Sequence, residues 1–209
     1  MFRSIVVAAI ACCTVVHAAP ITTPPPPLTA TGDVKAIYIF ANARNTSFLG
    51  EASPVVWAGI FCNHPSGSCA GNSAGDIVDL GTQSGPLRFG LRNITTSTTY
   101  WSDTPDAGGD YHAVFSTDYT SFGLGALPAA AATALAGLPN VTFVAWEDRD
   151  ATNGADFDYN DLVFAFSNTA STPPGVPEPL TLALFGSGLF GLTAFLRRRM
   201  RRSLAKASS

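Results

Sequence analysis

Short segments of alternating apolar and polar residues fill the chain between residues 33 and 167. In one of them, Leu87, Phe89 and Leu91 are separated by single polar or small residues, which is typical of a strand with one buried face. Turn residues separate these segments. The pattern predicts seven strands: Val34–Ala41, Val55–Cys62, Ile77–Leu80, Leu87–Ile94, Tyr111–Phe115, Val141–Trp146 and Leu162–Phe166.

One segment has a helical pattern. Pro128 suits a first helical position, residues 129–136 continue the helix, and Gly137 with Pro139 ends it. Short strands with turns between them predict a mostly β fold, an antiparallel, jelly-roll-like β-sandwich over residues 33–167 with one short Ala-rich helix.

The N-terminus has the features of an export signal. Arg3 precedes a short apolar stretch, Ile5–Val16, and small residues allow cleavage after Ala18 or Ala19. A spanning helix is the alternative, but this stretch is too short to cross a bilayer. We therefore expect a signal peptide over residues 1–19, used by the export translocon, and a Pro-rich linker over residues 20–32.

The C-terminus has the features of a membrane anchor. A polar linker, residues 168–175, precedes Leu180–Leu196, which has no charged residue and predicts a transmembrane helix over 180–196. The arginines that follow predict a cytoplasmic tail, residues 203–209, and place the preceding domain across the membrane. An ordinary C-terminal anchor would show the same pattern.

The end of the chain also resembles a known sorting signal. Residues 176–202 contain, in order, a V-P-E-P sequence, an apolar helix with glycines, and an arginine run, and they closely resemble the PEP-CTERM signal. The residues that carry the resemblance are Val176, Pro177, Glu178, Pro179, Arg197, Arg198 and Arg199. The resemblance implies a Gram-negative bacterium, a transient inner-membrane anchor with the domain in the periplasm, cleavage by an exosortase, and release to the cell surface or outside the cell.

Composition changes once these ends are set aside. The whole chain is 46% hydrophobic and 13% charged, with a mean hydropathy of +0.22, which would suggest a membrane protein. Residues 19–175 alone contain five basic and fourteen acidic residues. Such an acidic domain is not expected to bind nucleic acid, because phosphate contacts need clustered Lys and Arg.

Cysteine usage agrees with export. Cys62 and Cys69 remain after signal removal, and in an oxidising compartment we expect them to form a disulfide. A metal site is the alternative, but two cysteines and His64 are a poor ligand set.

An acidic loop carries the main candidate chemistry. Six carboxylates lie within Glu147–Asp161, and a hard cation would relieve their repulsion. The spacing is not that of an EF-hand, since Thr152 breaks the pattern. The predicted calcium ligands are Asp148, Asp150, Asp156, Asp158, Asn160 and Asp161. The alternative is a solvated acidic loop in which Asp and Asn form Asx-turns.

The same loop carries a second resemblance. Trp146-Glu147-Asp148, followed by the D-Y-N-D sequence Asp158–Asp161 and an apolar strand, resembles the signature of an uncharacterised β-rich domain of exported bacterial proteins. The resemblance implies fold and setting, and no activity.

Other motifs have simpler explanations. Gly71–Gly75 has the G-x-S-x-G spacing, with Asp110 and His112 in the chain order of a hydrolase triad, but no strand–turn–helix context surrounds it. Thr95–Thr99 allows ice binding, but a single short run is more simply an exposed strand or turn.

These features predict a non-enzymatic surface or extracellular-matrix protein that binds calcium and contacts an anionic exopolysaccharide. The alternative function is a glycan-active enzyme that uses Asp and Glu carboxylates.

Overall fold

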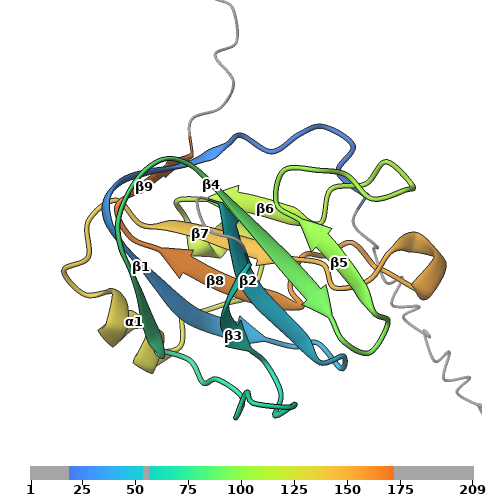
Figure 1. Ribbon diagram of the computed structural model, residues 1–209, viewed down its shortest axis with the longest axis horizontal. Coiled ribbons are helices and arrows are strands. Elements are labelled where there is room, and N and C mark those ends of the chain that lie inside the picture. Colours follow the sequence, from blue (N-terminus) through green and yellow to red (C-terminus); the bar gives the residue numbers. More distant parts are fainter. Residues whose placement is uncertain (1–18, 54–56, 172–209) are drawn as a thin grey trace, which may run out of the picture. The chain divides into compact units, whose positions relative to one another are not determined.

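A computed structural model describes residues 19–53 and 57–171. These residues form an antiparallel sheet with one α-helix and two 3₁₀ helices (Figure 1). The strands are β1 (Leu28–Ala41), β2 (Ser47–Ser53), β3 (Ala58–Cys62), β4 (Ile77–Asn93), β5 (Thr98–Trp101), β6 (Ala113–Ser116), β7 (Thr142–Trp146), β8 (Leu162–Phe166) and β9 (Thr169–Ser171). The helices are α1 (Ala129–Leu135), η1 (Tyr119–Phe122) and η2 (Ala151–Asn153).

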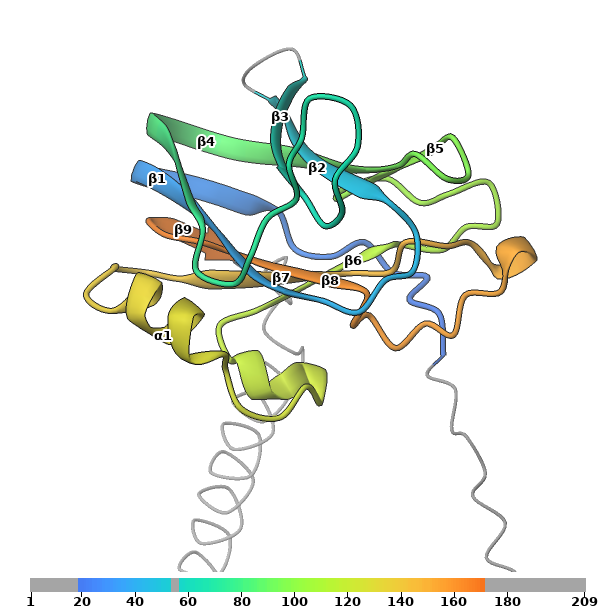
Figure 2. The same cartoon turned by 90° about the horizontal axis from the view of Figure 1, so that it is seen from below.

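The strands form one hydrogen-bonded path in the order β3-β2-β4-β1-β8-β7-β6, with β5 paired to β4 and β9 paired to β1. The long strands β1 and β4 pair through their N-terminal parts, whereas the C-terminal part of β4 pairs with β2 and β5. The sheet bends there, so that β2, β3 and β5 lie over β7 and β8 (Figure 2).

The main core fills the space between these two parts of the sheet. Phe89 of β4 stacks on Phe166 of β8 with ring centroids 4.2 Å apart, and Phe61 of β3 lies parallel to Phe164 at 5.8 Å. All four rings are almost fully buried. Burying such rings contributes about 1.5–3 kcal/mol each, so these contacts hold the bent sheet closed.

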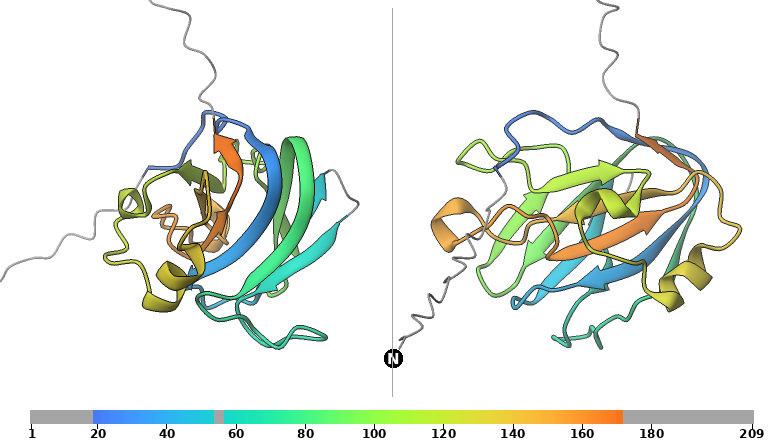
Figure 3. Two further views of the ribbon diagram at one scale, coloured as in Figure 1. Left: turned by 90° about the vertical axis from the view of Figure 1, so that its left-hand side faces the viewer. Right: turned by 180° about the vertical axis from the view of Figure 1, so that it is seen from behind.

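A second core lies on the opposite face of β1, β7 and β8, under α1. It contains Ile37 and Ile39 of β1, Val163 and Ala165 of β8, and Ala131 of α1. Figure 3 shows α1 covering this outer face. Every residue of β8 is buried because the strand has a core on each side. The first residue of β8, where the preceding loop ends, is therefore held in place by packing on both faces.

The structure confirms the mostly β, antiparallel class and the single short helix. Helix α1 begins at Ala129, one residue later than predicted, and Pro128 is its N-cap. The jelly-roll-like sandwich stays a prediction. Strands β2, β5 and β9 lie in segments for which no strand was predicted, and β1 begins at Leu28, inside the predicted linker.

Cys62 and Cys69 form a disulfide with Cα atoms 6.4 Å apart, which closes the turn after β3. The predicted signal peptide, the transmembrane helix 180–196 and the tail 203–209 lie outside the described residues. Among the helices of residues 19–53 and 57–171, none has the length and apolar character needed to cross a membrane.

Candidate metal site in the β7–β8 loop

Residues 147–161 connect two fully buried strands. Trp146 ends β7 and Leu162 begins β8, and the two residues are directly paired. Outside the strands, the Glu147 N–H donates to the His112 carbonyl at 3.0 Å, and the Asp161 carbonyl accepts from Asn42 N at 2.8 Å. Both ends of the loop are therefore fixed by backbone hydrogen bonds.

Two aromatic residues hold the returning half of the loop. Phe157 and Tyr159 are buried, with φ of 54° and 53°. Non-glycine residues rarely adopt this left-handed conformation, which persists only where surrounding contacts enforce it. Here the Tyr159 hydroxyl donates to the Tyr111 carbonyl at 2.9 Å and accepts from Ile21 N at 3.0 Å. Because the aromatic residues point into the core, the neighbouring Asp156 and Asp158 are left nearer the surface.

The loop brings five carboxylates together in two overlapping groups. One group is Glu147, Asp156 and Asp158, and the other is Glu147, Asp148 and Asp161. Within each group, one oxygen from every residue lies within 4.8 Å of the others. Four of these acids, with Asn160, line a pocket of about 180 Å³.

Glu147 is common to both groups and is the most constrained of the acids. Its side chain is 1% exposed, and its Oε2 atom has no hydrogen-bond partner among the described residues. Burial, together with the nearby charge of Asp161, raises the pKa of the Glu147 carboxyl to about 9. A buried, unpartnered carboxylate oxygen is costly unless a cation or proton satisfies it.

Asp148 differs because protein groups already hold it. Its carboxylate accepts from Asn45 Nδ2 at 3.3 Å and from Ser47 Oγ at 3.2 Å. Its own backbone N–H donates to Asp161 Oδ2 at 2.9 Å. Burial, followed by the charge of Asp161, raises the pKa of the Asp148 carboxyl to about 6. Asp148 therefore connects the loop to β2. In the other group, Asp158 accepts hydrogen bonds from Asn160 N at 3.2 Å and from Asn160 Nδ2, so the oxygens of Glu147 and Asp156 are the more available ones.

Two arginines moderate the negative charge. Arg44 and Arg149 also line the pocket, and Arg149 Nε lies 3.8 Å from Asp148 Oδ1. With Glu147 protonated at neutral pH, the three aspartates of the pocket still outnumber its two arginines, so its charge remains negative. All of the side-chain donor atoms offered by the acids and by Asn160 that could bind a metal are oxygens, which suits a hard cation.

The six residues predicted as ligands do not all meet. The structure brings Asp148, Asp156, Asp158 and Asp161 into the two groups, and Asn160 lies at the same pocket. Asp150 lies elsewhere: its carboxylate accepts from Asn153 N at 2.9 Å and caps η2. Asp150 lines a separate pocket of about 290 Å³ together with Asp106 and Asp110.

Glu147 was absent from the predicted ligand set. The sequence placed it among the six crowded acids but gave no sign that it would be buried. That burial comes from its position one residue after a strand with a core on both sides, and from the His112 carbonyl that holds its backbone. A carboxylate directly after a continuous apolar strand is the only signal in the sequence that could have suggested it.

The residues of the G-x-S-x-G motif and its suggested triad have other roles in the structure. Ser73 is exposed, and its backbone N–H donates to Asp76 Oδ2 at 3.0 Å in a tight turn. His112 is buried and stacks on Tyr100. Its ring nitrogens lie 3.1 Å from the Glu147 carbonyl and 3.1 Å from Asp106 Oδ2. His112 thus supports the backbone at Glu147.

The fold and the loop define a mostly β domain with a candidate metal site. Residues 175–199 match the PEP-CTERM protein-sorting motif, so the chain carries the signal of an exported protein that is sorted by an exosortase. No curated protein and no solved structure matches the chain. The resemblance of residues 158–161 to the D-Y-N-D signature stays a prediction.

Proposed function

We propose that this protein is a non-enzymatic surface or extracellular-matrix protein whose β7–β8 loop binds calcium. The observation that carries the proposal is Glu147 Oε2, which is buried, has no hydrogen-bond partner within residues 19–53 and 57–171, and belongs to both groups of carboxylates. A divalent cation there would satisfy this oxygen and neutralise Asp156 and Asp158.

The donor set supports calcium over other metals. Calcium accepts about six to eight oxygen ligands in flexible geometry, and loops with several carboxylates and water suit it. Magnesium requires a stricter octahedral arrangement, and zinc prefers nitrogen and sulfur ligands. In this proposal Glu147, Asp156 and Asp158 supply the carboxylate oxygens, while Asp161 and Asn160 lie beside them at the pocket.

The setting supports a role for such a loop outside the cytoplasm. The sorting motif directs the protein through export, and extracellular calcium modules typically bind with dissociation constants of about 10⁻⁴–10⁻³ M. A site with such a dissociation constant needs calcium at a similar concentration, so the cation would order the loop only after export. The ordered acidic loop would then contribute to contacts in the surface layer.

A glycan-cleaving enzyme is the alternative. Such an enzyme would use the Glu147 carboxyl as its general acid, because the raised pKa keeps this group protonated. Glycosidase carboxyl groups, however, are separated by about 5–9 Å across the bond that they cleave. Within each of the two groups, one oxygen from every residue lies within 4.8 Å of the others, and this close approach supports a shared cation.

The test is thermal unfolding of the full chain in detergent, with calcium or with chelator. Calcium at about a hundred times its dissociation constant would add about 2.7 kcal/mol, which is about 5–10 °C for a domain of this size. We expect Glu147→Gln to abolish the shift. Asp79→Asn should keep it, because this exposed carboxylate of β4 accepts a hydrogen bond from Gly81 N and from no other residue that the structure describes.

An equal calcium shift in wild type and Glu147→Gln would contradict the proposed site. The enzyme alternative has its own readout, the release of reducing ends from polygalacturonate. Release that is lost in Glu147→Gln would favour the enzyme and overturn the non-enzymatic role.

A further inference from the structure

Two tryptophans lie side by side on the outer face of the sheet formed by β2, β4 and β5. Trp57 and Trp101 are partly exposed, with ring centroids 5.9 Å apart and planes nearly perpendicular. Each of the other large aromatic contacts described above is buried. A pair of indoles that keeps solvent access therefore needs a separate explanation.

Glycines in the sheet make room for these rings. Gly50 of β2 pairs with Gly90 of β4, and Gly90 pairs with Trp101 of β5, so the three residues form a row across the sheet. A Cβ atom on Gly50 would lie 2.6 Å from the Trp57 ring, and one on Gly90 would lie 2.7 Å from it. The Trp57 indole thus packs directly on the backbone, and any larger residue at either position would displace it.

Arginines flank the same row. Arg88 and Arg92 lie two residues either side of Gly90, so they share its face of β4, while Phe89 and Leu91 are fully buried on the other face. The Arg88 guanidinium lies 4.2 Å from the centroid of Trp101. Arg92 is exposed and forms no ion pair with any other described residue.

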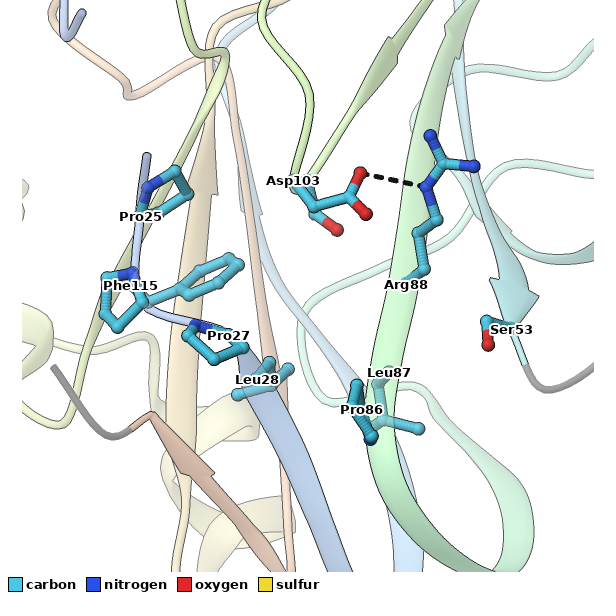
Figure 4. Close-up of a pocket in the computed structure, with 11 residues that line it drawn as sticks. Pro25, Pro27, Leu28, Ser53, Pro86, Leu87, Arg88, Asp103 and Phe115 are labelled. Atoms are coloured by element: carbon cyan, nitrogen blue, oxygen red, sulfur yellow. Dashed lines mark hydrogen bonds and ion pairs between the residues drawn. The ribbon is translucent and has the colours of Figure 1, made fainter. Parts of the chain in front are cut away.

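The Arg88 side chain is held in place. Its Nε atom donates to Asp103 Oδ1 at 2.8 Å, and its Nη2 atom donates to Thr104 Oγ1 at 3.3 Å. Figure 4 shows this pair at the rim of an adjoining groove that contains Leu28, Leu87 and Phe115. The groove and the aromatic row meet at Arg88, which lines the groove and lies over the Trp101 ring.

We propose that Trp57, Trp101, Arg88 and Arg92 form a binding platform for an acidic polysaccharide. The aliphatic C–H face of a pyranose ring stacks on indole surfaces, and guanidinium groups bind carboxylates of uronic acids. The domain has five basic residues against fourteen acidic ones, and two of the five lie on this face. Because Arg88 is paired with Asp103, Arg92, which has no ion-pair partner among the described residues, carries the positive charge that attracts an anionic polymer to this face, whereas the acidic remainder of the domain repels one.

The platform identifies an acidic polysaccharide as the ligand of the surface protein proposed above. This inference rests on the proposed function only in assuming that the domain lies outside the cell. It does not need the calcium site, because none of its residues belongs to the acidic groups of the β7–β8 loop. Binding measured in chelator therefore separates the two proposals.

The test is affinity electrophoresis of the full chain in detergent and chelator, with polygalacturonate or neutral dextran in the gel. We expect polygalacturonate to retard the wild-type chain and dextran to leave its mobility unchanged. Trp101→Ala and Arg92→Glu should each weaken binding at least about tenfold, as expected for central aromatic and arginine contacts.

Two variants serve as matched controls. Lys35→Glu makes the same charge change on β1, and Ile77→Ala removes an apolar side chain that is 48% exposed at the other end of β4. Both should bind like wild type. Because Arg92 is exposed, Arg92→Glu tests the platform even if Trp101→Ala does not fold.

Two outcomes would overturn the proposal. Polygalacturonate could fail to retard the wild-type chain, or Arg92→Glu could bind as well as Lys35→Glu. A platform that does not bind polygalacturonate, but whose substitution changes the oligomeric state in size-exclusion chromatography, would instead be a protein contact.

Discussion

At Glu147, burial and neighbouring charge act in the same direction. The side chain is removed from water and faces Asp161, and both effects favour its protonated form, with a pKa of about 9. A cation would reverse this preference, since it binds the carboxylate. The protonation of Glu147 therefore determines how stable the loop is without metal.

This arrangement predicts a pH dependence for the metal-free protein. The folded-state pKa of Glu147 is raised above 4.5, so its stabilising effect is complete at low pH and is lost as pH rises toward about 9. In chelator, we expect the melting temperature of wild type to fall relative to Glu147→Gln between about pH 5 and pH 9. Parallel curves for the two chains would contradict the burial of this carboxyl in a crowded acidic site.

Tyr159 supplies the second prediction at this scale. Tyr159→Phe removes hydrogen bonds to Ile21 N and to the Tyr111 carbonyl and leaves both groups unpaired. We expect a loss of about 1–3 kcal/mol in denaturant unfolding. Tyr38→Phe is the control, because the Tyr38 hydroxyl has no hydrogen-bond partner among the described residues, and it should change stability by less than about 0.5 kcal/mol. Equal losses would show that the Tyr159 hydroxyl does not hold the loop.

Part of the site could be predicted from the sequence. Asp156, Asp158 and Asp161 are close along the chain, so proximity in sequence was sufficient to place them together. Proximity in sequence could not predict that Glu147 lies in the site and that Asp150 lies outside it. Their difference arises from the hydrogen bond between Glu147 N–H and the His112 carbonyl, and from the capping of η2 by Asp150. Neither effect is contained in a count of acids.

At the scale of elements, β4 shows where the sequence pattern is insufficient. Residues 77–80 and 87–94 were predicted as separate strands because Gly81, Gly85 and Pro86 lie between them. In the structure β4 continues through all three, with a register shift opposite Val34 that absorbs the irregularity. Pairing with the long β1 therefore overrides the local turn preference.

The contact between the loop before β4 and α1 gives a prediction for these elements. Gly75 has a φ of 93°, and a Cβ atom there would lie 2.8 Å from the Ala130 carbonyl. We expect Gly75→Ala to destabilise the protein by about 1–3 kcal/mol. Gly59 has no atom within 4 Å of such a Cβ, and Gly59→Ala should change stability by at most about 1 kcal/mol. Similar effects at both positions in denaturant unfolding would argue against this packing.

At the scale of the whole molecule, the chain combines an acidic β domain with a sorting motif at residues 175–199. The hydrophobic ends explain the membrane-like average composition, and the mostly β class followed from the strand patterns between them. The bend of the sheet over itself did not follow, because it depends on long-range contacts such as Phe89 with Phe166.

Processing at the tail is testable by mass spectrometry of the protein recovered from the cell surface. We expect the C-terminus to end near residues 176–180, without the arginine run. Substitution of Glu178 by Gln should leave the tail attached if the Pro-Glu-Pro sequence is the recognised element. Surface protein that retains Arg197–Arg202 would contradict cleavage.

The most direct test of the central claim is calcium titration calorimetry on the full chain in detergent. A cation site centred on Glu147 predicts a saturable heat for wild type, for Asp79→Asn and for Asp150→Asn, and none for Glu147→Gln. The absence of calcium heat at millimolar metal, or the same heat in wild type and Glu147→Gln, would contradict it.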